Sequence, residues 1–373
     1  MESAPWAPTR ASKKPCEKFL RVRAGWQGKP RLLAAITPNT LRINLNILTS
    51  RVFGEQNLKG VPMKLAVANG DRVFVVRAEE AVDVTSSISS IPHVSISDLM
   101  IGLAADFAKA RPSIERAAAS GKGVPLSSLH FEAPIPRPRN IVCMAVNYME
   151  DGTRSAPALI NAFHKAPTSV IGHGGTMILP DAPASNFEAE AEIALIIGKR
   201  ASNVSVANAM SHVFGYLNFI DGSARGLLPH DQRFFQVKSR DTFAPMGPFI
   251  VTADEVPDPQ KLQIRLWVNG VIKQDFNTDD MAHKIPRCIE WASSIHTLEP
   301  GDVLATGTNH RGLSSLQNGD MVELECQGMG RLSFKVRDEL KRTWSRETRL
   351  EREQKGLEPL TPQLSGKYSI PTP

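Results

Sequence analysis

The chain has 373 residues, of which 42% are hydrophobic, and this suits a folded protein with a substantial core. Its formal net charge is +6, but residues 1–62 hold 11 Lys or Arg against 3 Asp or Glu, while the remainder holds 33 against 35. The basic character therefore belongs to the first segment, and the near-neutral remainder argues against a nucleic-acid-binding surface.

Three features bear on the cellular compartment. No apolar run approaches the roughly 18 residues of a membrane span, so we expect no membrane partner. We also expect no secretory signal peptide, because no apolar h-region is recognisable. The four cysteines are scattered, which favours reduced thiols and a cytoplasmic protein; they are Cys16, Cys143, Cys288 and Cys326.

Residues 1–62 lack sustained hydrophobic periodicity and are poor in acids. We expect residues 1–62 to be either the product of an upstream translation start or a basic extension that is disordered or dispensable, because Met63 begins a strand-like segment. A mitochondrial targeting segment is the alternative, since such segments are also basic.

The next segment predicts a hairpin followed by a helix. Residues 64–76 alternate around Asn69-Gly70, a strong signal for a tight turn. Ser95 and Asp98 resemble a capping box in front of a helical pattern over 99–110.

A second short helix is expected over 114–119, and together these elements form a small N-terminal module over 63–135. The Pro-rich stretch 134–138 is the boundary, because proline continues neither helix nor strand. We assign 136–344 to a catalytic domain. Residues 345–373 contain few apolar side chains and are expected to form a flexible C-terminal tail, with an arm around a partner subunit as the alternative.

The catalytic domain shows further strand and helix patterns. An amphipathic helix is expected over 206–214. Residues 262–268 and 271–276 predict strands that pair across Asn269-Gly270, and 321–326 alternate as a further strand.

The most informative stretch contains two acids directly before an apolar segment. Glu190 and Glu192 precede Ile193 to Ile197, which is typical of a buried strand. Because side chains at i and i+2 leave the same face of a strand, the two carboxylates are expected to project together at its mouth. Such a pair stays ionised only beside positive charge, and a hard divalent cation is the natural candidate.

A third acid, Asp221, ends another apolar run, where we expect a strand to pass into a loop. In this order, the motif segments resemble the fumarylacetoacetate hydrolase family over roughly Met63 to Val336; they are 190–198, 215–225, 236–248 and 298–308. The resemblance implies an α+β, β-rich fold with a mixed β-sandwich-like roll, as a homodimer. It also implies that Glu190, Glu192 and Asp221 bind a catalytic Mg²⁺, or Mn²⁺ or Ca²⁺.

The resemblance further implies a substrate site for a small 2-oxo or 2,4-dioxo acid. Lys238 matches a lysine that contacts substrate oxygen, and Arg225 an arginine that can hold a carboxylate. Thr308 matches a hydrogen-bond donor, and Lys165 lies in a segment that resembles the family's F-x-K. Two alternatives stay open: Lys238 as a solvated surface lysine, and Thr308 as an ordinary turn residue.

The chain departs from the family at its water-activating pair. Many family hydrolases have N-Y-x-x-H with a glutamate three residues later. Here Asn147 and Tyr148 are present, and Tyr148 is assigned to substrate binding, but Asp151 and Arg154 occupy the histidine and glutamate positions. We expect Asp151 or Glu150 to act as base through water, with plain turn chemistry as the alternative.

Two histidines are the best-placed substitutes for the lost one by sequence, His173 and His230. The first hypothesis for function is a metal-dependent hydrolase that cleaves a C–C bond of an acylpyruvate-like acid in aromatic catabolism. The second is a lyase or isomerase on a 2-oxo acid, which needs no activated water. A noncatalytic binding protein is the third.

Overall fold

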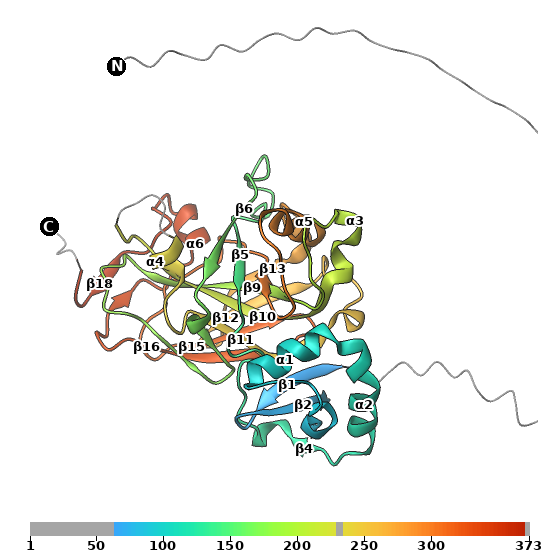
Figure 1. Cartoon of the computed structure of the whole chain (residues 1–373). Helices are drawn as coiled ribbons and strands as arrows, with labels where there is room; N and C mark the ends of the chain where they lie inside the picture. The colour runs from blue at the N-terminus through green and yellow to red at the C-terminus, as the bar shows by residue number, and fades with distance from the viewer. Residues whose placement is uncertain (1–62, 229–233, 370–373) are drawn as a thin grey trace, which may run out of the picture. The chain divides into compact units, whose positions relative to one another are not determined.

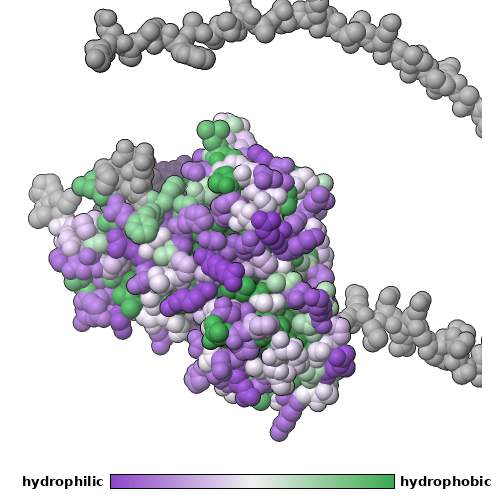
Figure 2. Space-filling view, viewed as in Figure 1, coloured by the Kyte–Doolittle hydropathy of each residue, from purple (hydrophilic) through white to green (hydrophobic). Residues whose placement is uncertain are grey.

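The computed structural model describes residues 63–228 and 234–369 (Figure 1). The expected extension over 1–62 and His230 therefore lie outside the described residues. None of the helices in the described ranges has the length and apolar content that a membrane span requires. On the face shown in Figure 2, hydrophilic and hydrophobic residues are interspersed.

A large mixed sheet forms the centre of the fold. Its strand order is β4-β3-β2-β1-β11-β10-β9-β14-β5-β6, with β7 paired to β11. The bounds are β1 Lys64–Ala68, β2 Arg72–Arg77, β3 Glu80–Asp83, β4 Val124–Pro125, β5 Ile141–Ala145, β6 Asn161–Lys165, β7 Val170–Ile171, β9 Phe187–Ile197, β10 Val213–Ala224, β11 Ala244–Thr252 and β14 Val303–Ala305.

A second, five-stranded sheet covers one face of β9 and β10. Its order is β13-β12-β15-β16-β8, with bounds β8 Thr176–Ile178, β12 Gln263–Val268, β13 Val271–Asn277, β15 Met321–Cys326 and β16 Leu332–Arg337. One hydrophobic cluster joins the two sheets, for example through Ile193, Leu195 and Leu324. The expected β-rich α+β fold is confirmed, and so are the hairpin across Asn269-Gly270 and the strand over 321–326.

The other face of β9 packs on the N-terminal module. Ala194 and Ile196 belong to a cluster that also contains Leu99 and Leu103 of α1 (Ile96–Ala105). The module is not separate from the body, because β1 pairs with β11 and extends the large sheet.

The hairpin expected around Asn69-Gly70 is present as β1 and β2. The side chain of Ser95 caps α1 by accepting from the Asp98 amide at 3.2 Å. The helical region is longer than expected, because α1 is followed after Asp106 by α2 (Phe107–Ser120), which includes the short helix predicted over 114–119.

The helix expected over 206–214 is shorter. Here α3 (Val206–Ala209) passes into a 3-10 turn, and Val213 already begins β10, because the chain must pair with β9 from that point. A longer helix, α5 (Ile285–Ile295), packs beside α3.

The C-terminal segment differs from the expected flexible tail. Within residues 345–369 the chain forms α6 (Arg349–Gln354) and β18 (Gln363–Ser365), and β18 pairs with β17 (Thr343–Trp344), which lies just before the expected tail. Arg352 and Thr361 of this segment are buried, and immediately before it Trp344 packs in the main core and Arg342 is fully buried on Asp338. A few deeply buried side chains therefore anchor a segment whose overall composition is polar.

Candidate active site

Two adjacent strands bring three carboxylates together. In the antiparallel pair β9 and β10, Glu190 lies opposite Asp221, so both side chains leave the same face as Glu192. Their ligand oxygens lie within 4.8 Å of one another, and all three residues are buried. Glu190 and Glu192 lie inside β9, and Asp221 lies inside β10. The prediction that the two glutamates lie at the start of a strand, and Asp221 at the end of another, was therefore wrong. Both strands are longer than their apolar runs.

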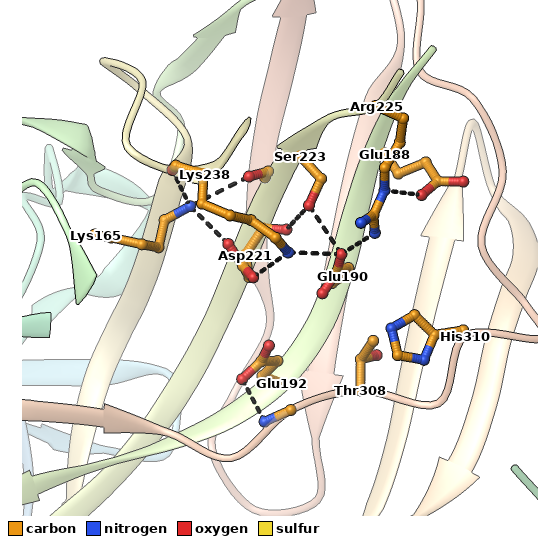
Figure 3. A network of polar contacts seen from close by, with 12 residues as sticks. Lys165, Glu188, Glu190, Glu192, Asp221, Ser223, Arg225, Lys238, Thr308 and His310 are labelled. Atoms are coloured by element: carbon orange, nitrogen blue, oxygen red, sulfur yellow. Dashed lines mark hydrogen bonds and ion pairs between the residues drawn. The ribbon is translucent and has the colours of Figure 1, made fainter. Parts of the chain in front are cut away.

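Two buried lysines hold these acids from one side (Figure 3). Lys238, at the end of α4 (Phe234–Lys238), places Nζ 2.8 Å from Glu190 Oε1 and 2.5 Å from Asp221 Oδ2. Lys165 Nζ lies 2.6 Å from Asp221 Oδ1 and also donates to the carbonyl of Lys238 at 2.5 Å. Lys238 is therefore not a solvated surface lysine, since it is only 4% exposed.

An arginine and a third glutamate flank the opposite side. Arg225 donates through Nη2 to Glu190 Oε1 and through Nε to Glu188 Oε2 at 2.8 Å. Ser223 donates to the same oxygen of Glu190 at 2.8 Å. Both donor arms of Arg225 thus serve protein carboxylates. Glu188 was missed from the sequence, although the spacing from Glu188 to Glu192 repeats the same two-residue period.

The pKa values of Glu190 and Glu192 shift in opposite directions. Burial raises the pKa of Glu190, but Lys238 and Arg225 outweigh it and hold that pKa well below its usual range. Burial, with repulsion from Asp221 and Glu190, raises the pKa of Glu192 well above its usual range, and the Gly307 amide opposes this only in part.

Glu192 also carries an unsatisfied oxygen. Its Oε2 accepts from the Gly307 amide at 2.7 Å, whereas its Oε1 is buried and has no hydrogen-bond partner among the described residues. Gly307 has a φ of +89°, and a Cβ there would lie 3.0 Å from Asn147 Cβ, so a glycine is required for this amide to reach Glu192. A buried, crowded carboxylate set with an orphaned oxygen fits a hard divalent cation.

A glutamate–histidine pair lies next to this cluster. His310 Nδ1 is 2.7 Å from Glu150 Oε1, and the His310 amide donates to Glu150 Oε2 at 2.8 Å. Burial raises the pKa of Glu150, but its hydrogen bond and proximity to His310 lower it overall. Figure 3 shows His310 beside Thr308, on the segment that follows β14 and faces β9. His310 was missed from the sequence, although it lies only two residues beyond Thr308.

The loop that carries Glu150 is bent so that neighbouring side chains diverge. Glu150 and Asp151 both have φ near 56°, a left-handed conformation that is unusual for glutamate. Glu150 is buried, whereas the Asp151 side chain is 53% exposed and lies 3.7 Å from Arg311. Asn147 ties this loop to the segment after β14 by donating to the Thr306 carbonyl at 2.9 Å.

The remaining predicted residues occupy different surroundings. Tyr148 is fully buried against Phe276, and burial raises its pKa, so it belongs to the core beneath the site. Thr308 is buried, and its hydroxyl accepts from Gln274 at 2.8 Å. His173 accepts from the Ser333 amide and stacks edge-on against Phe131, in a separate part of the fold.

Two cavities of the described part of the chain lie away from the acids. Cavities of about 890 and 800 Å³ lie where the N-terminal module meets the body, and both are lined by Phe131 and His173. A cavity of about 590 Å³ adjoins the acidic cluster and includes Glu150, Arg225 and His310. The chemistry points to this smaller cavity, because it alone of the three is lined by Arg225, which donates to Glu190, and by the glutamate–histidine pair.

The fold and the acidic cluster together define an enzyme of the fumarylacetoacetate hydrolase type. Residues 140–337 match the family model described as "Fumarylacetoacetate (FAA) hydrolase C-terminal". The chain belongs to this family, as its sequence motifs predicted.

Characterised relatives span several reactions. The chain is 36% identical over 223 residues to the oxaloacetate tautomerase YisK of Bacillus subtilis, which covers 57% of this chain and 74% of that protein. It is 38% identical over 206 residues to the 4-hydroxyphenylacetate degradation bifunctional isomerase/decarboxylase of Salmonella dublin, covering 54% of this chain and 48% of that protein.

Among solved structures, the chain resembles maleylpyruvate hydrolase from Sphingobium sp. SYK-6 in complex with manganese(II) ion and pyruvate. The TM-score is 0.67 at 34% identity, over 74% of this chain and 99% of that chain. Family membership thus establishes the enzyme class, with hydrolases, isomerases and tautomerases among its members.

Proposed function

We propose that this protein is a divalent-metal-dependent hydrolase that cleaves a C–C bond of a 2,4-dioxo acid. The observation that carries the proposal is the Glu150–His310 pair beside the three acids. Asp151 and Arg154 replace the family's usual histidine and glutamate. From the sequence alone, this replacement favoured a reaction that needs no activated water. A glutamate and a histidine from other positions supply the chemistry that hydrolysis needs.

The acids and lysines have separate roles. Glu190, Glu192 and Asp221 would hold Mg²⁺ or Mn²⁺, and the cation would act as a Lewis acid on the oxygens of a bound 2-oxo acid. Similarity to a hydrolase solved with manganese supports this choice of cation. Lys238 places its ammonium between two of these carboxylates, where it can stabilise negative charge that develops on the substrate oxygens.

His310 is the residue that transfers the proton. Its Nδ1–H donates to Glu150, which fixes the tautomer and leaves Nε2 as the acceptor. Nε2 takes a proton from water as the water oxygen attacks the C4 carbonyl carbon. The C3–C4 bond then breaks, its electron pair forms the enolate of the 2-oxo acid, and the imidazolium returns the proton to C3. The products are a carboxylic acid and a 2-oxo acid.

A tautomerase is the second candidate function. The same imidazole can move a proton between C3 and an enol oxygen without water entering the product, and similarity to an oxaloacetate tautomerase favours this alternative. It needs the same acids and the same lysine, so the two candidates differ only in whether water attacks.

We also propose a cytoplasmic homodimer with a role in the breakdown of aromatic compounds. Three buried cysteines without disulfide partners among the described residues support a reducing compartment. Similarity to an enzyme of 4-hydroxyphenylacetate degradation supports the catabolic role.

A panel of acylpyruvates and oxaloacetate, incubated with Mg²⁺ or Mn²⁺ and followed by product mass, tests the proposed function. Two acids as products support the hydrolase. A product of unchanged mass supports the tautomerase, and loss of CO₂ a decarboxylase. No metal-dependent turnover of any member would contradict all three.

A further inference from the structure

The C-terminal segment reaches the candidate active site from outside the matched part of the chain. The family model covers residues 140–337, whereas α6 begins at Arg349. The Arg349 side chain is only 19% exposed, and it lines the cavity of about 590 Å³ together with Arg225. A residue that the family model does not include therefore lies beside the site.

Arg349 is connected to the acidic cluster through Glu188. Its Nε donates to Glu188 Oε1 at 3.0 Å and its Nη2 to Glu188 Oε2 at 2.5 Å, the bidentate geometry of a guanidinium on a carboxylate. Arg225 donates through Nε to the same Oε2 at 2.8 Å and through Nη2 to Glu190 Oε1. Figure 3 shows Arg225 between Glu188 and Glu190. An unbroken line of charge-assisted contacts therefore runs from α6 to Glu190.

The buried charge of Glu188 is balanced by two arginines together. Glu188 is only 1% exposed, and in the described part of the chain its ion-pair partners are Arg225 and Arg349. Asn186 adds a neutral donor to Oε1 at 3.3 Å. Removing one partner from a buried ion pair leaves an uncompensated charge. Without Arg349, Glu188 would draw toward itself the guanidinium of Arg225, which now also serves Glu190.

The backbone of α6 holds Arg349 in place. The Arg349 amide donates to the Leu313 carbonyl at 2.9 Å, and the Leu350 amide donates to the Arg311 carbonyl at 2.8 Å. Both acceptors belong to the segment that carries His310, and a capping box fixes the first turn of the helix. Because its backbone is anchored, Arg349 presents its guanidinium from a fixed position.

Arg225 is the residue through which these contacts act on the reaction. It donates to Glu190 and also lines the cavity that contains Glu150 and His310, the pair assigned to proton transfer. A guanidinium displaced from Glu190 would change the electrostatics of the acids and of this cavity together. The position of Arg225 is therefore expected to affect turnover.

We infer that Arg349 is a positioning residue for the reaction. By balancing the charge of Glu188, it keeps Arg225 on Glu190. The C-terminal segment is thereby a functional part of the active site, although it lies outside the matched region. This inference rests on the proposed function and holds for both candidate reactions, because both use the same acids. Arg349 pairs with Glu188 and, in the described ranges, with none of the three acids, so its effect passes through Arg225.

A double-mutant cycle in the full chain tests the inference. Arg349→Met leaves Glu188 unbalanced and should lower kcat/KM for the best substrate of the panel by at least about tenfold. Adding Glu188→Gln removes the charge that draws Arg225 away, and should restore kcat/KM to within about threefold of wild type. In the Glu188→Gln background, Arg349→Met should change kcat/KM by less than about twofold. That comparison does not require the single variant Arg349→Met to fold.

Mn²⁺ affinity measured by calorimetry gives a readout that needs no turnover. Arg349→Met removes a positive charge from the network around the acids and frees Glu190 Oε1, so Mn²⁺ should bind at least about threefold more tightly. The double variant with Glu188→Gln restores the net charge and should bind Mn²⁺ within about twofold of wild type. A site that is merely damaged would instead bind Mn²⁺ more weakly.

Arg352→Met is the matched control on the same helix. Arg352 is buried, pairs with Glu347 at 3.0 Å and donates to the Glu358 carbonyl at 2.6 Å, so it anchors α6 through partners other than Glu188. Its loss should lower the melting temperature but keep kcat/KM within about twofold of wild type.

The outcomes separate this inference from the proposed function. Unchanged kcat/KM in Arg349→Met, a double variant no more active than Arg349→Met, or weaker Mn²⁺ binding in Arg349→Met would each overturn the inference. An equal loss of kcat/KM in Arg352→Met would do the same, since α6 would then act only as a support. No turnover of the panel by the wild-type protein would contradict the proposed function, and Mn²⁺ affinity would still decide whether Arg349 acts on Glu190.

Discussion

Glu150 and His310 are 160 positions apart in the sequence, yet His310 Nδ1 lies 2.7 Å from Glu150 Oε1. The amide of His310 donates to the other oxygen of the same carboxylate, so the pair is held by two contacts. Glu150 belongs to a left-handed turn and His310 to the segment after β14. Asn147 links the two segments and keeps the pair beside the three acids.

The pair makes a direct prediction for catalysis. His310→Ala and Glu150→Gln should each lower kcat by about 10²–10⁴-fold, because a positioned base contributes an effect of that size. Steady-state kinetics on the best substrate of the panel measures this loss. Mn²⁺ affinity should stay within about threefold of wild type in both variants, since neither residue is assigned to the cation. Variants that keep most of the wild-type kcat would show that the pair is only structural.

Asp151 provides the matched comparison. The Asp151 side chain makes no buried contact comparable to the Glu150–His310 hydrogen bond, and it is half exposed. Asp151→Asn should therefore lower kcat by less than about tenfold, well short of the loss of a positioned base. The same kinetic assay decides between the two neighbours. If Asp151→Asn is as inactive as Glu150→Gln, the exposed aspartate is the base and our assignment of the pair is wrong.

The acidic cluster predicts a specific metal dependence. Chelation should abolish activity, and Mg²⁺ or Mn²⁺ should restore it. Glu192→Gln keeps the shape of the side chain but removes one charged ligand, so Mn²⁺ affinity measured by calorimetry should fall by at least about a hundredfold. Glu299→Gln, an exposed acid paired with Arg200, serves as the control. Unchanged Mn²⁺ affinity in Glu192→Gln would remove Glu192 from the metal site.

The buried pair of Arg342 and Asp338 is expected to contribute measurably to the free energy of unfolding. Arg342 and Asp338 are both fully buried, and the guanidinium donates to both Asp338 oxygens and to the carbonyls of Pro180 and Ala182. Arg342→Leu leaves a buried carboxylate without its partner and should lower the free energy of unfolding by about 3–5 kcal/mol. Denaturant titration measures this change.

An exposed pair is the control for that experiment. Arg337 and Glu339 lie 2.9 Å apart with both side chains more than half exposed, so Arg337→Leu should cost less than about 1 kcal/mol. Equal stability losses for Arg337→Leu and Arg342→Leu would mean that the Arg342–Asp338 pair is not buried as the structure shows.

The sequence predicted the acidic residues of the site better than their positions within the strands. The two-residue spacing of Glu190 and Glu192 was sufficient to place both on one face, because strand geometry is local. Their position well inside β9 was not predictable, since these acidic residues interrupt the apolar pattern that indicates a strand. Glu188 follows the same spacing but was missed for this reason.

Other features depend on contacts between distant segments. His310 becomes visible as a partner of Glu150 only when the turn at Glu150 and the segment after β14 are placed together. Residues 345–373 have a polar composition typical of a flexible tail, and a few buried side chains within them, such as Arg352 and Thr361, hold the described part in place. Neither relationship has a local sequence pattern.

Cleavage in water enriched in oxygen-18 tests the central claim most directly, namely that water activated beside the acidic cluster cleaves the C3–C4 bond. With Mg²⁺ and the preferred dioxo acid, the acid released from the C4 side should carry the label in its carboxylate, beyond the exchange seen without enzyme, and His310→Ala should remove that excess. Consumption of the substrate without two product acids and without excess label would contradict hydrolysis and leave the tautomerase.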